Sequence, residues 1–152
     1  MKSLNTDHII SKVLMPLDVL QVEKYNLELV STFCYQHFAT LTLMYVIDPD
    51  IMPRRFRVLN KSNIEVMKLI KIGKNQLNEI AMNIRSNHDI IIDNIVQIGD
   101  EGKEICDFAV KKRYNLIVLP SPFLINHKML THEESMTILR HAPCPVLLIP
   151  PA

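Results

Sequence analysis

The stretch "DIIIDNIVQIGDEGKEICDFAVKKRYNLIVLP", residues 89–120, decides the fold. Short runs rich in isoleucine, valine and leucine stand at its two ends, at 89–99 and 115–120. Between them, apolar residues recur at three- and four-residue steps over 101–112, which is the spacing of an amphipathic helix. A strand, a helix and a second strand in about 30 residues form a βαβ unit. The stretch therefore predicts two parallel strands joined by a right-handed helical crossover.

The same alternation extends along the rest of the chain. Further strand-length apolar runs occupy 12–17, 40–47 and 145–150, and helical spacing occupies 20–38, 60–86 and 132–140. Five strands therefore alternate with four helices, and several strands are apolar nearly throughout, as in a sheet covered on both faces. We expect one α/β domain over 1–152, Rossmann-like, with an open five-stranded parallel sheet and helices on both faces.

Composition argues against several classes of protein. Net charge is +1, with 17 basic and 16 acidic residues, whereas nucleic-acid-binding proteins usually carry a clear basic excess. The three cysteines, Cys34, Cys106 and Cys144, form no CxxC pair, which indicates reduced thiols rather than a disulfide framework. No apolar segment approaches the ~20 residues of a membrane span. We therefore expect a cytoplasmic protein that contacts neither nucleic acid nor membrane.

Asp18 is the first candidate ligand residue, because it directly follows the run 12–17. A carboxylate at the carboxyl end of a parallel strand can accept hydrogen bonds from a ligand amine or hydroxyl. An aspartate there can equally cap the helix that follows. The sequence leaves both readings open.

Metal and nucleophile sites find little support. "HEESM" (132–136) has Met136 where a zinc-protease helix needs its second histidine, and His127, His132 and His141 lack convincing ligand spacing. Ser121 lies in Pro-Ser-Pro rather than in G-x-S-x-G. We predict neither a metal site nor a catalytic centre.

Two further features favour structural readings over functional ones. Cys144 lies between two prolines before an apolar run, as a structural thiol would. A basic stretch spans 54–74 and comprises Arg54, Arg55, Arg57, Lys61, Lys68, Lys71 and Lys74. It is an ordinary solvated helix face or, less favoured, a surface for an anionic partner.

Four segments, taken together, resemble the universal stress protein family. "KVLMPLD" (12–18) resembles its first strand and aspartate, and "ATLTLMYVIDP" (39–49) resembles its second strand. "IVQIGDEGKEICDFAVKKRYNLIVL" (95–119) is similar to its third strand, glycine turn, third helix and fourth strand. "ILRHAPCPVLLIP" (138–150) is similar to its C-terminal signature and is the most specific of the four.

The resemblance implies the sheet order 3-2-1-4-5 and a homodimer joined through the last strand. An exposed, wholly apolar edge strand would otherwise be an aggregation hazard, which agrees with that expectation. The expected interface residues are Pro145, Val146, Leu147, Leu148, Ile149 and Pro150.

One branch of the family binds ATP through G-x-x-G, nine residues, then G-[ST], placed directly after the fourth strand. Matched to this chain, the first glycine falls on Pro120, the second on Phe123 or Pro122, and the last pair on His132-Glu133. All three glycines are missing, and the chain holds 3 glycines in total where usage of about 7% would give roughly 11.

The missing glycines predict that this loop binds phosphates weakly or not at all. Proline at position 120 has no N–H to donate, and losing two hydrogen bonds to a charged group would cost roughly 3–6 kcal/mol. Glu133 and Glu134 would add repulsion. We therefore expect no cofactor, ATP included. What the resemblance still implies is a residual adenine pocket, formed by Asp18, Val46, Ile47, Leu119, Pro120 and Ser121.

The resulting expectation is a universal stress protein of the non-ATP-binding type, a homodimeric regulatory or interaction module with a protein partner that the sequence does not identify. The alternative is a sensor of the same family that binds a nucleotide or another adenine ligand. In that case His127 and Lys128 would supply cationic contacts in place of backbone donors.

Overall fold

The computed structural model describes residues 10–49, 64–120, 132–150 and 152. Its centre is one five-stranded sheet in the order β3-β2-β1-β4-β5, and every neighbouring pair of strands is parallel. The strands are β1 (Lys12–Pro16), β2 (Thr40–Ile47), β3 (Ile92–Ile98), β4 (Leu116–Pro120) and β5 (Val146–Ile149). The predicted α/β fold and the strand order are therefore confirmed.

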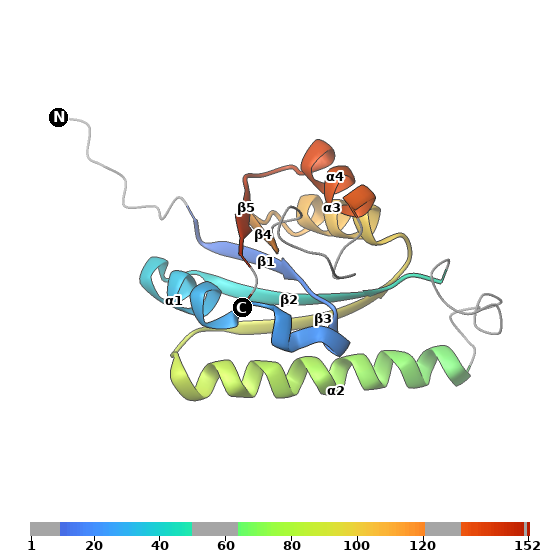
Figure 1. Cartoon of the computed structure of the whole chain (residues 1–152), viewed down its shortest axis with the longest axis horizontal. Helices are drawn as coiled ribbons and strands as arrows, with labels where there is room; N and C mark the ends of the chain where they lie inside the picture. The colour runs from blue at the N-terminus through green and yellow to red at the C-terminus, as the bar shows by residue number, and fades with distance from the viewer. Residues whose placement is uncertain (1–9, 50–63, 121–131, 151) are drawn as a thin grey trace.

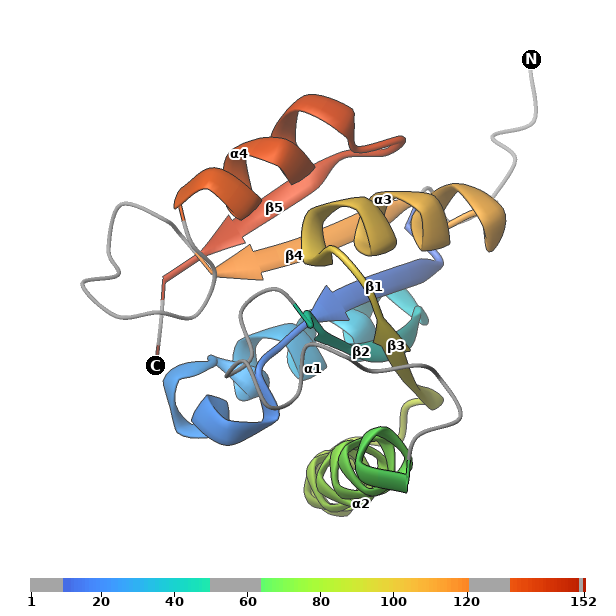
Figure 2. The ribbon, with the colours of Figure 1, turned by 90° about the vertical axis from the view of Figure 1, so that its right-hand side faces the viewer.

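Helices cover both faces of the sheet, as Figures 1 and 2 show. The helices are η1 (Val19–Lys24), α1 (Leu27–His37), α2 (Ile64–Asn87), α3 (Glu101–Lys111) and α4 (His132–His141). The first three lie on one face, and α3 and α4 lie side by side on the other. None of the described helices is both long and apolar enough to cross a membrane.

The period-two alternation of the strands divides the core into two layers. Val13, Met15 and Leu17 of the first strand and its continuation point toward α1 and α2, where they pack with Leu77 and other buried residues. Leu14, between them in sequence, points toward the opposite layer under α3 and α4. Because both faces are buried, the strands read as continuous apolar runs rather than as alternating ones.

The first helical segment differs from its prediction over 20–38. A short 3-10 helix, η1, is followed by Tyr25, whose extended backbone (φ −90°, ψ 138°) ends it. Asn26 then caps α1 through its side-chain oxygen, which accepts the Leu29 N–H at 3.1 Å. Two capped helices therefore replace the single one that apolar spacing had suggested.

The contact between β1 and β4 forms a short seam at the middle of the sheet. Strand β1 pairs with β2 from Lys12–Thr40 to Pro16–Met44, whereas its registered pairs with β4 are Val13–Leu116 and Leu14–Ile117. Leu17 donates its N–H to Met44 on the β2 side, so the ring nitrogen of Pro16 is turned toward β4. Ile117 donates to Pro145 on the β5 side, so the nitrogen of Pro120 is turned toward β1. Two prolines that cannot donate therefore face the seam at its carboxyl end.

Candidate ligand site at the carboxyl end of the sheet

Asp18 lies where β1 leaves the sheet, next to the point where the strand order reverses. Its Oδ1 accepts the backbone N–H of Leu20 at 2.9 Å, and its Oδ2 accepts the side-chain amide of Gln21 at 3.0 Å. Its own N–H donates to the hydroxyl of buried Tyr25 at 2.7 Å. The structure therefore shows Asp18 as a cap, with both carboxylate oxygens engaged in the η1 turn, and its ligand role stays a prediction.

Helix α3 begins at the same end of the sheet, after β3. Asp100 caps it, with Oδ1 accepting the N–H of Lys103 at 2.9 Å, and Glu101 and Glu104 add negative charge to the first turn. These carboxylates compensate the partial positive charge of the helix N-terminus. An external anion would have to compete with them for the same backbone donors.

Gly99 makes the tight turn between β3 and α3. It has φ +153° and donates its N–H to Ile47 at the end of β2 at 3.1 Å. At this φ any larger residue would be strained, and its Cβ would lie 2.6 Å from a carboxylate oxygen of Glu104, which would have to move. The turn thereby ties the ends of β2 and β3 together.

The electrostatics of this end are negative. Burial is the main cause that raises the pKa of the Tyr25 hydroxyl. The hydrogen bond with the Asp18 backbone N–H opposes it, and the Asp18 and Glu101 carboxylates each raise the pKa by a smaller amount. Burial, Asp18 and Glu101, in that order, also raise the pKa of Tyr45. The same two carboxylates therefore act on two tyrosines that come from different elements, and both stabilise the neutral phenol.

The sequence was also compared with models of known protein families. The model described as the universal stress protein family matches residues 10–150. This chain belongs to the universal stress protein family. Among curated proteins, none matches the sequence.

Solved structures of other universal stress proteins share the fold. Universal stress protein UspA from Lactobacillus plantarum has a TM-score of 0.68 at 19% identity, covering 91% of this chain and 97% of its own. A family member from Burkholderia pseudomallei has a TM-score of 0.65 at 23% identity, covering 93% and 97%. The universal stress protein from Archaeoglobus fulgidus in complex with dAMP has a TM-score of 0.57 at 14% identity, covering 93% and 98%. Similarity at these identities shows the fold alone.

The residues expected to line an adenine pocket in this universal stress protein occupy different environments. Asp18 is partly exposed, whereas Val46, Ile47 and Leu119 are buried in the sheet. Pro120 is the buried last residue of β4. Ser121 lies outside the described residues, as do Phe123, His127 and Lys128. The structure thus brings Asp18, Ile47 and Pro120 to one end of the sheet, where only Asp18 of the three is partly exposed.

Other candidates from the sequence keep their structural readings where the structure describes them. Cys34, Cys106 and Cys144 are free thiols, and burial raises the pKa of Cys144. Lys68, Lys71 and Lys74 are exposed along α2. No group of three or more histidine, cysteine or acidic residues within the described ranges could hold a metal ion. Positions 54–61 of the basic stretch and the side chain of His132 lie outside what the structure describes.

Two hollows elsewhere in this universal stress protein were not expected from the sequence. One lies at the amino end of the sheet, has a volume of about 340 Å³ and is lined by Cys34, Tyr35, Phe38, Ala39, Thr40, Asp89, Ile90 and Ile91. The other lies between α3 and α4 and is lined by Gly102, Lys103, Cys106, Asp107, Val110, Thr137 and His141. Each combines residues distant in sequence, so apolar spacing within one segment gave no signal of either.

Proposed function

We propose that this universal stress protein does not bind ATP and acts as a homodimeric, non-catalytic regulatory module that contacts other proteins. The observation that carries the proposal is the use of Asp18 and Asp100 as internal caps at the carboxyl end of the sheet. Nucleotide phosphates commonly bind the N–H groups at such helix starts. Here the chain's own carboxylates already accept from those groups, and a triphosphate would meet them at close range.

The seam between β1 and β4 supports the same proposal. A family-type phosphate loop would begin at Pro120, where the fingerprint has glycine, and Pro120 lies at the end of β4 with its nitrogen turned toward β1. Pro16 faces the same gap from β1. Neither residue has an N–H to donate, so two backbone positions beside the switch point contribute no phosphate contact.

Calorimetric titration of the full chain with Mg-ATP tests the proposal. We expect no measurable heat of binding in the micromolar range, and the variant Pro120→Gly, which restores one backbone donor, should gain little because Asp18, Asp100 and Glu101 remain. Micromolar binding by the unaltered protein would contradict the proposal. Adding Asp100→Asn to Pro120→Gly should raise affinity more than either change alone if the carboxylates are the obstacle.

Strand β5 supports the proposed dimer. It is an edge strand of the sheet, pairs with β4 from Ile117–Val146 to Pro120–Ile149, and exposes Leu147 and Leu148. An apolar edge of this kind can pair with a second copy of itself. We therefore expect Pro145 to Pro150 to form the dimer contact.

Sedimentation equilibrium checks this assignment. We expect the unaltered protein to be a dimer and Leu148→Asp to shift it toward monomer. Val110→Asp, at an exposed apolar position of α3, is the matched control and should leave the mass unchanged. A dimer that tolerates Leu148→Asp, or one that Val110→Asp disrupts equally, would place the contact elsewhere.

One observation favours a second candidate, a sensor for adenine-containing ligands. The Archaeoglobus fulgidus relative is described in complex with dAMP, and Asp18 of this chain keeps part of its side chain exposed at the carboxyl end of the sheet. A thermal-shift series with AMP, dAMP, ADP and ATP separates the two functions. A clear rise in melting temperature with any of them, lost in Asp18→Ala, would favour the sensor.

A further inference from the structure

Phe38 occupies a backbone conformation that is costly for its side chain. It ends α1 in the left-handed region (φ 54°, ψ 33°), and its N–H closes the helix onto Cys34 and Tyr35. Glycine or asparagine usually fills this position because a larger side chain crowds the backbone there. The ring is 80% exposed, so burial does little to offset the strain. Phe38 therefore combines a left-handed backbone with a largely exposed ring.

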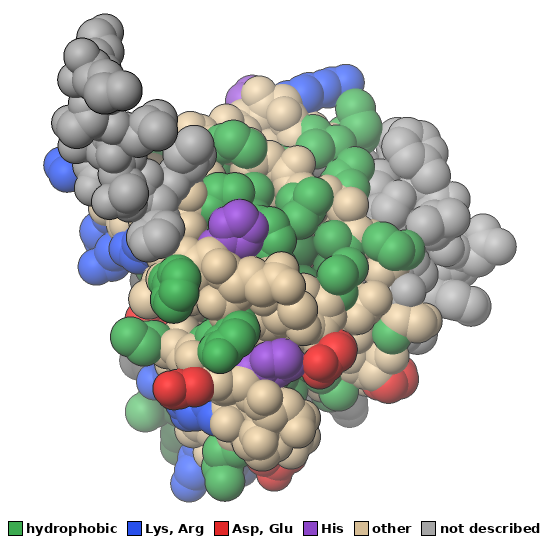
Figure 3. All heavy atoms as spheres, turned by 90° about the vertical axis from the view of Figure 1, so that its left-hand side faces the viewer, with side chains coloured by type: hydrophobic (Ala, Val, Ile, Leu, Met, Phe, Trp, Pro, Cys, Tyr) green, Lys and Arg blue, Asp and Glu red, His purple; other side chains and the backbone are tan. Residues whose placement is uncertain are grey.

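The ring stands beside the pocket at the amino end of the sheet. Tyr35 and Ile91, which also line this pocket, are 53% and 67% exposed. Figure 3 shows hydrophobic side chains gathered over this end, with histidine side chains among them. A volume of about 340 Å³ lies in the range that small-molecule sites occupy. The pocket thus combines two aromatic residues with an apolar wall.

The charge at this pocket is negative. Asp89 is acidic, and none of the described residues that line the pocket is basic. Two nearby nitrogen-bearing side chains have other partners: Nε2 of His88 lies 3.0 Å from the Glu28 carboxylate, and the Arg85 guanidinium donates to the Ile92 carbonyl at 2.7 Å. Aromatic faces beside a carboxylate are the surroundings that favour a cation.

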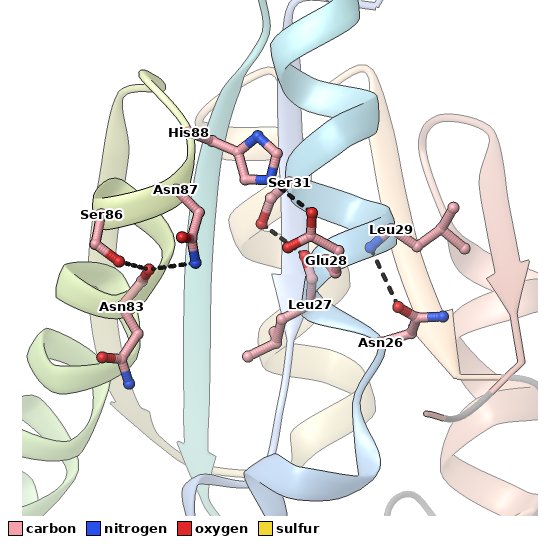
Figure 4. Close-up of polar contacts among 9 residues, drawn as sticks. All are labelled: Asn26, Leu27, Glu28, Leu29, Ser31, Asn83, Ser86, Asn87 and His88. Atoms are coloured by element: carbon pink, nitrogen blue, oxygen red, sulfur yellow. Dashed lines mark hydrogen bonds and ion pairs between the residues drawn. The ribbon is translucent and has the colours of Figure 1, made fainter.

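The walls of the pocket are held by helix-end contacts that Figure 4 displays. The His88–Glu28 pair joins the end of α2 to α1, and the Tyr35 ring lies 6.2 Å from the His88 ring. Ser86 donates to the Asn83 carbonyl at 2.6 Å and thereby fixes the last turn of α2. On the other side, Leu41 donates to Ile91 at 2.9 Å. The hollow therefore lies between tethered segments.

We propose that this pocket binds an organic cation, an ammonium or guanidinium group carried on an apolar body. The Tyr35 and Phe38 rings would contact the cation and its alkyl or aromatic body, and Asp89 would supply the opposite charge. The cation can be a free amine or an arginine or lysine side chain of a protein. The site is at the opposite end of the sheet from Asp18, so it stands or falls independently of nucleotide binding.

Nuclear magnetic resonance titration of the full chain with benzyltrimethylammonium tests the proposal, with benzyl alcohol as the neutral probe. We expect saturable amide shifts at Tyr35, Thr40 and 89–91, and binding of the neutral probe weaker by about tenfold. A second arm compares a short arginine peptide with its citrulline counterpart. If the arginine peptide binds more tightly than benzyltrimethylammonium, the natural ligand is a protein side chain. If benzyltrimethylammonium binds more tightly, the natural ligand is a small molecule.

Two variants of the pocket and one control make the result decisive. Phe38→Asn removes the ring and suits the left-handed backbone, so affinity should fall about tenfold while the melting temperature does not fall. Asp89→Asn should lower the affinity for the cationic probe but not the affinity for the neutral probe. Met82→Gln, at an exposed apolar position of α2, should change neither. Equal binding of both probes, unchanged affinity in Phe38→Asn, or no saturable shift in the millimolar range would overturn the proposal.

Discussion

The two ends of the sheet differ in how the central strands β1 and β4 are hydrogen-bonded to each other. At the amino end, the Asn115 side chain closes the β1–β4 seam by accepting the N–H groups of Ser11 and Lys12 at 3.1 and 2.9 Å. At the carboxyl end, Pro16 and Pro120 leave the seam without donors, and internal carboxylates occupy the helix starts. Parallel sheets usually bind ligands at the carboxyl end. Among the described residues, the helix starts at that end are capped by Asp18 and Asp100, whereas the amino end carries a pocket with exposed aromatic rings.

The largest effect is expected in an alkaline titration of stability, because each end of the sheet holds a buried group that loses a proton at high pH: the Cys34 thiol at the amino end and the Tyr25 phenol at the carboxyl end. Burial raises the pKa of Cys34 from 9.0 to about 12. The folded state keeps the thiol protonated where the unfolded chain loses its proton, so stability present below pH 9 falls as pH rises from 9 to about 12. The loss should be on the order of 1.4 kcal/mol per pH unit. Denaturant unfolding of wild type and Cys34→Ala between pH 8 and 11 measures it.

The carboxyl end supplies the control for that titration. Tyr25→Phe removes a phenol whose pKa is also raised, but its effect should begin only above the ordinary tyrosine pKa of 10.0. A stability profile of Cys34→Ala that matches the wild-type profile from pH 9 to 10 would show that the thiol is not responsible.

Removing the cap at Asp18 should have the next largest effect. Asp18→Ala leaves the Leu20 N–H and the Gln21 amide without their present acceptor, at a cost of about 1–2 kcal/mol in the free energy of unfolding. Chemical denaturation measures this change. Glu23→Ala, on the exposed side of η1, should stay within about 0.5 kcal/mol. If Asp18→Ala lowers the free energy of unfolding no more than this control does, the Asp18 cap does not stabilise the carboxyl end.

Relieving the strained turn at the amino end should raise stability by a smaller amount. Phe38→Asn should add about 0.5 kcal/mol to the free energy of unfolding, because asparagine accepts the left-handed backbone more readily. Arg113 has φ 58°, and Arg113→Asn is therefore a matched relief of strain away from the pocket. Both variants should gain stability, but only Phe38→Asn should lose cation binding. A loss of stability in Phe38→Asn alone would mean that the ring supports the fold.

The smallest effect should come from the pair that joins α1 to the end of α2. Glu28 is largely exposed, so Glu28→Gln should cost less than about 0.5 kcal/mol, and 1 M salt should reduce the difference further. A double-mutant cycle with His88→Gln measures the coupling. A coupling above about 1 kcal/mol would show that this pair, rather than helix packing, holds the pocket wall.

Sequence patterns located the strands well because burial on both faces leaves a continuous apolar signal. The run 40–47 coincides with β2, while the run 89–99 is longer than β3, which begins at Ile92. The difference arises because the N–H of Ile90 bonds back to His88 in a turn before the strand. Isoleucines at 90 and 91 resemble strand residues in composition, and turn geometry is invisible in that pattern.

The sites were less predictable than the fold. The place of Asp18 after the first strand predicted a cap or a ligand residue; the structure shows the cap, and the ligand role stays a prediction. The amino-end pocket joins residues 34–40 to 89–91, which only the pairing of β2 with β3 brings together. The left-handed turn at Phe38 was also missed, because such turns are recognised by glycine or asparagine and this one has neither.

The short β1–β4 seam has a mechanical consequence. It divides the sheet into a three-stranded part and a two-stranded part, and the shared boundary carries fewer registered pairs than the β1–β2 or β4–β5 boundaries. Under tension, or in amide hydrogen exchange, the molecule should part along this line first, with β4 and β5 leaving together. A force applied to β5 would therefore act first on the β1–β4 boundary, which has the fewest registered pairs in the sheet.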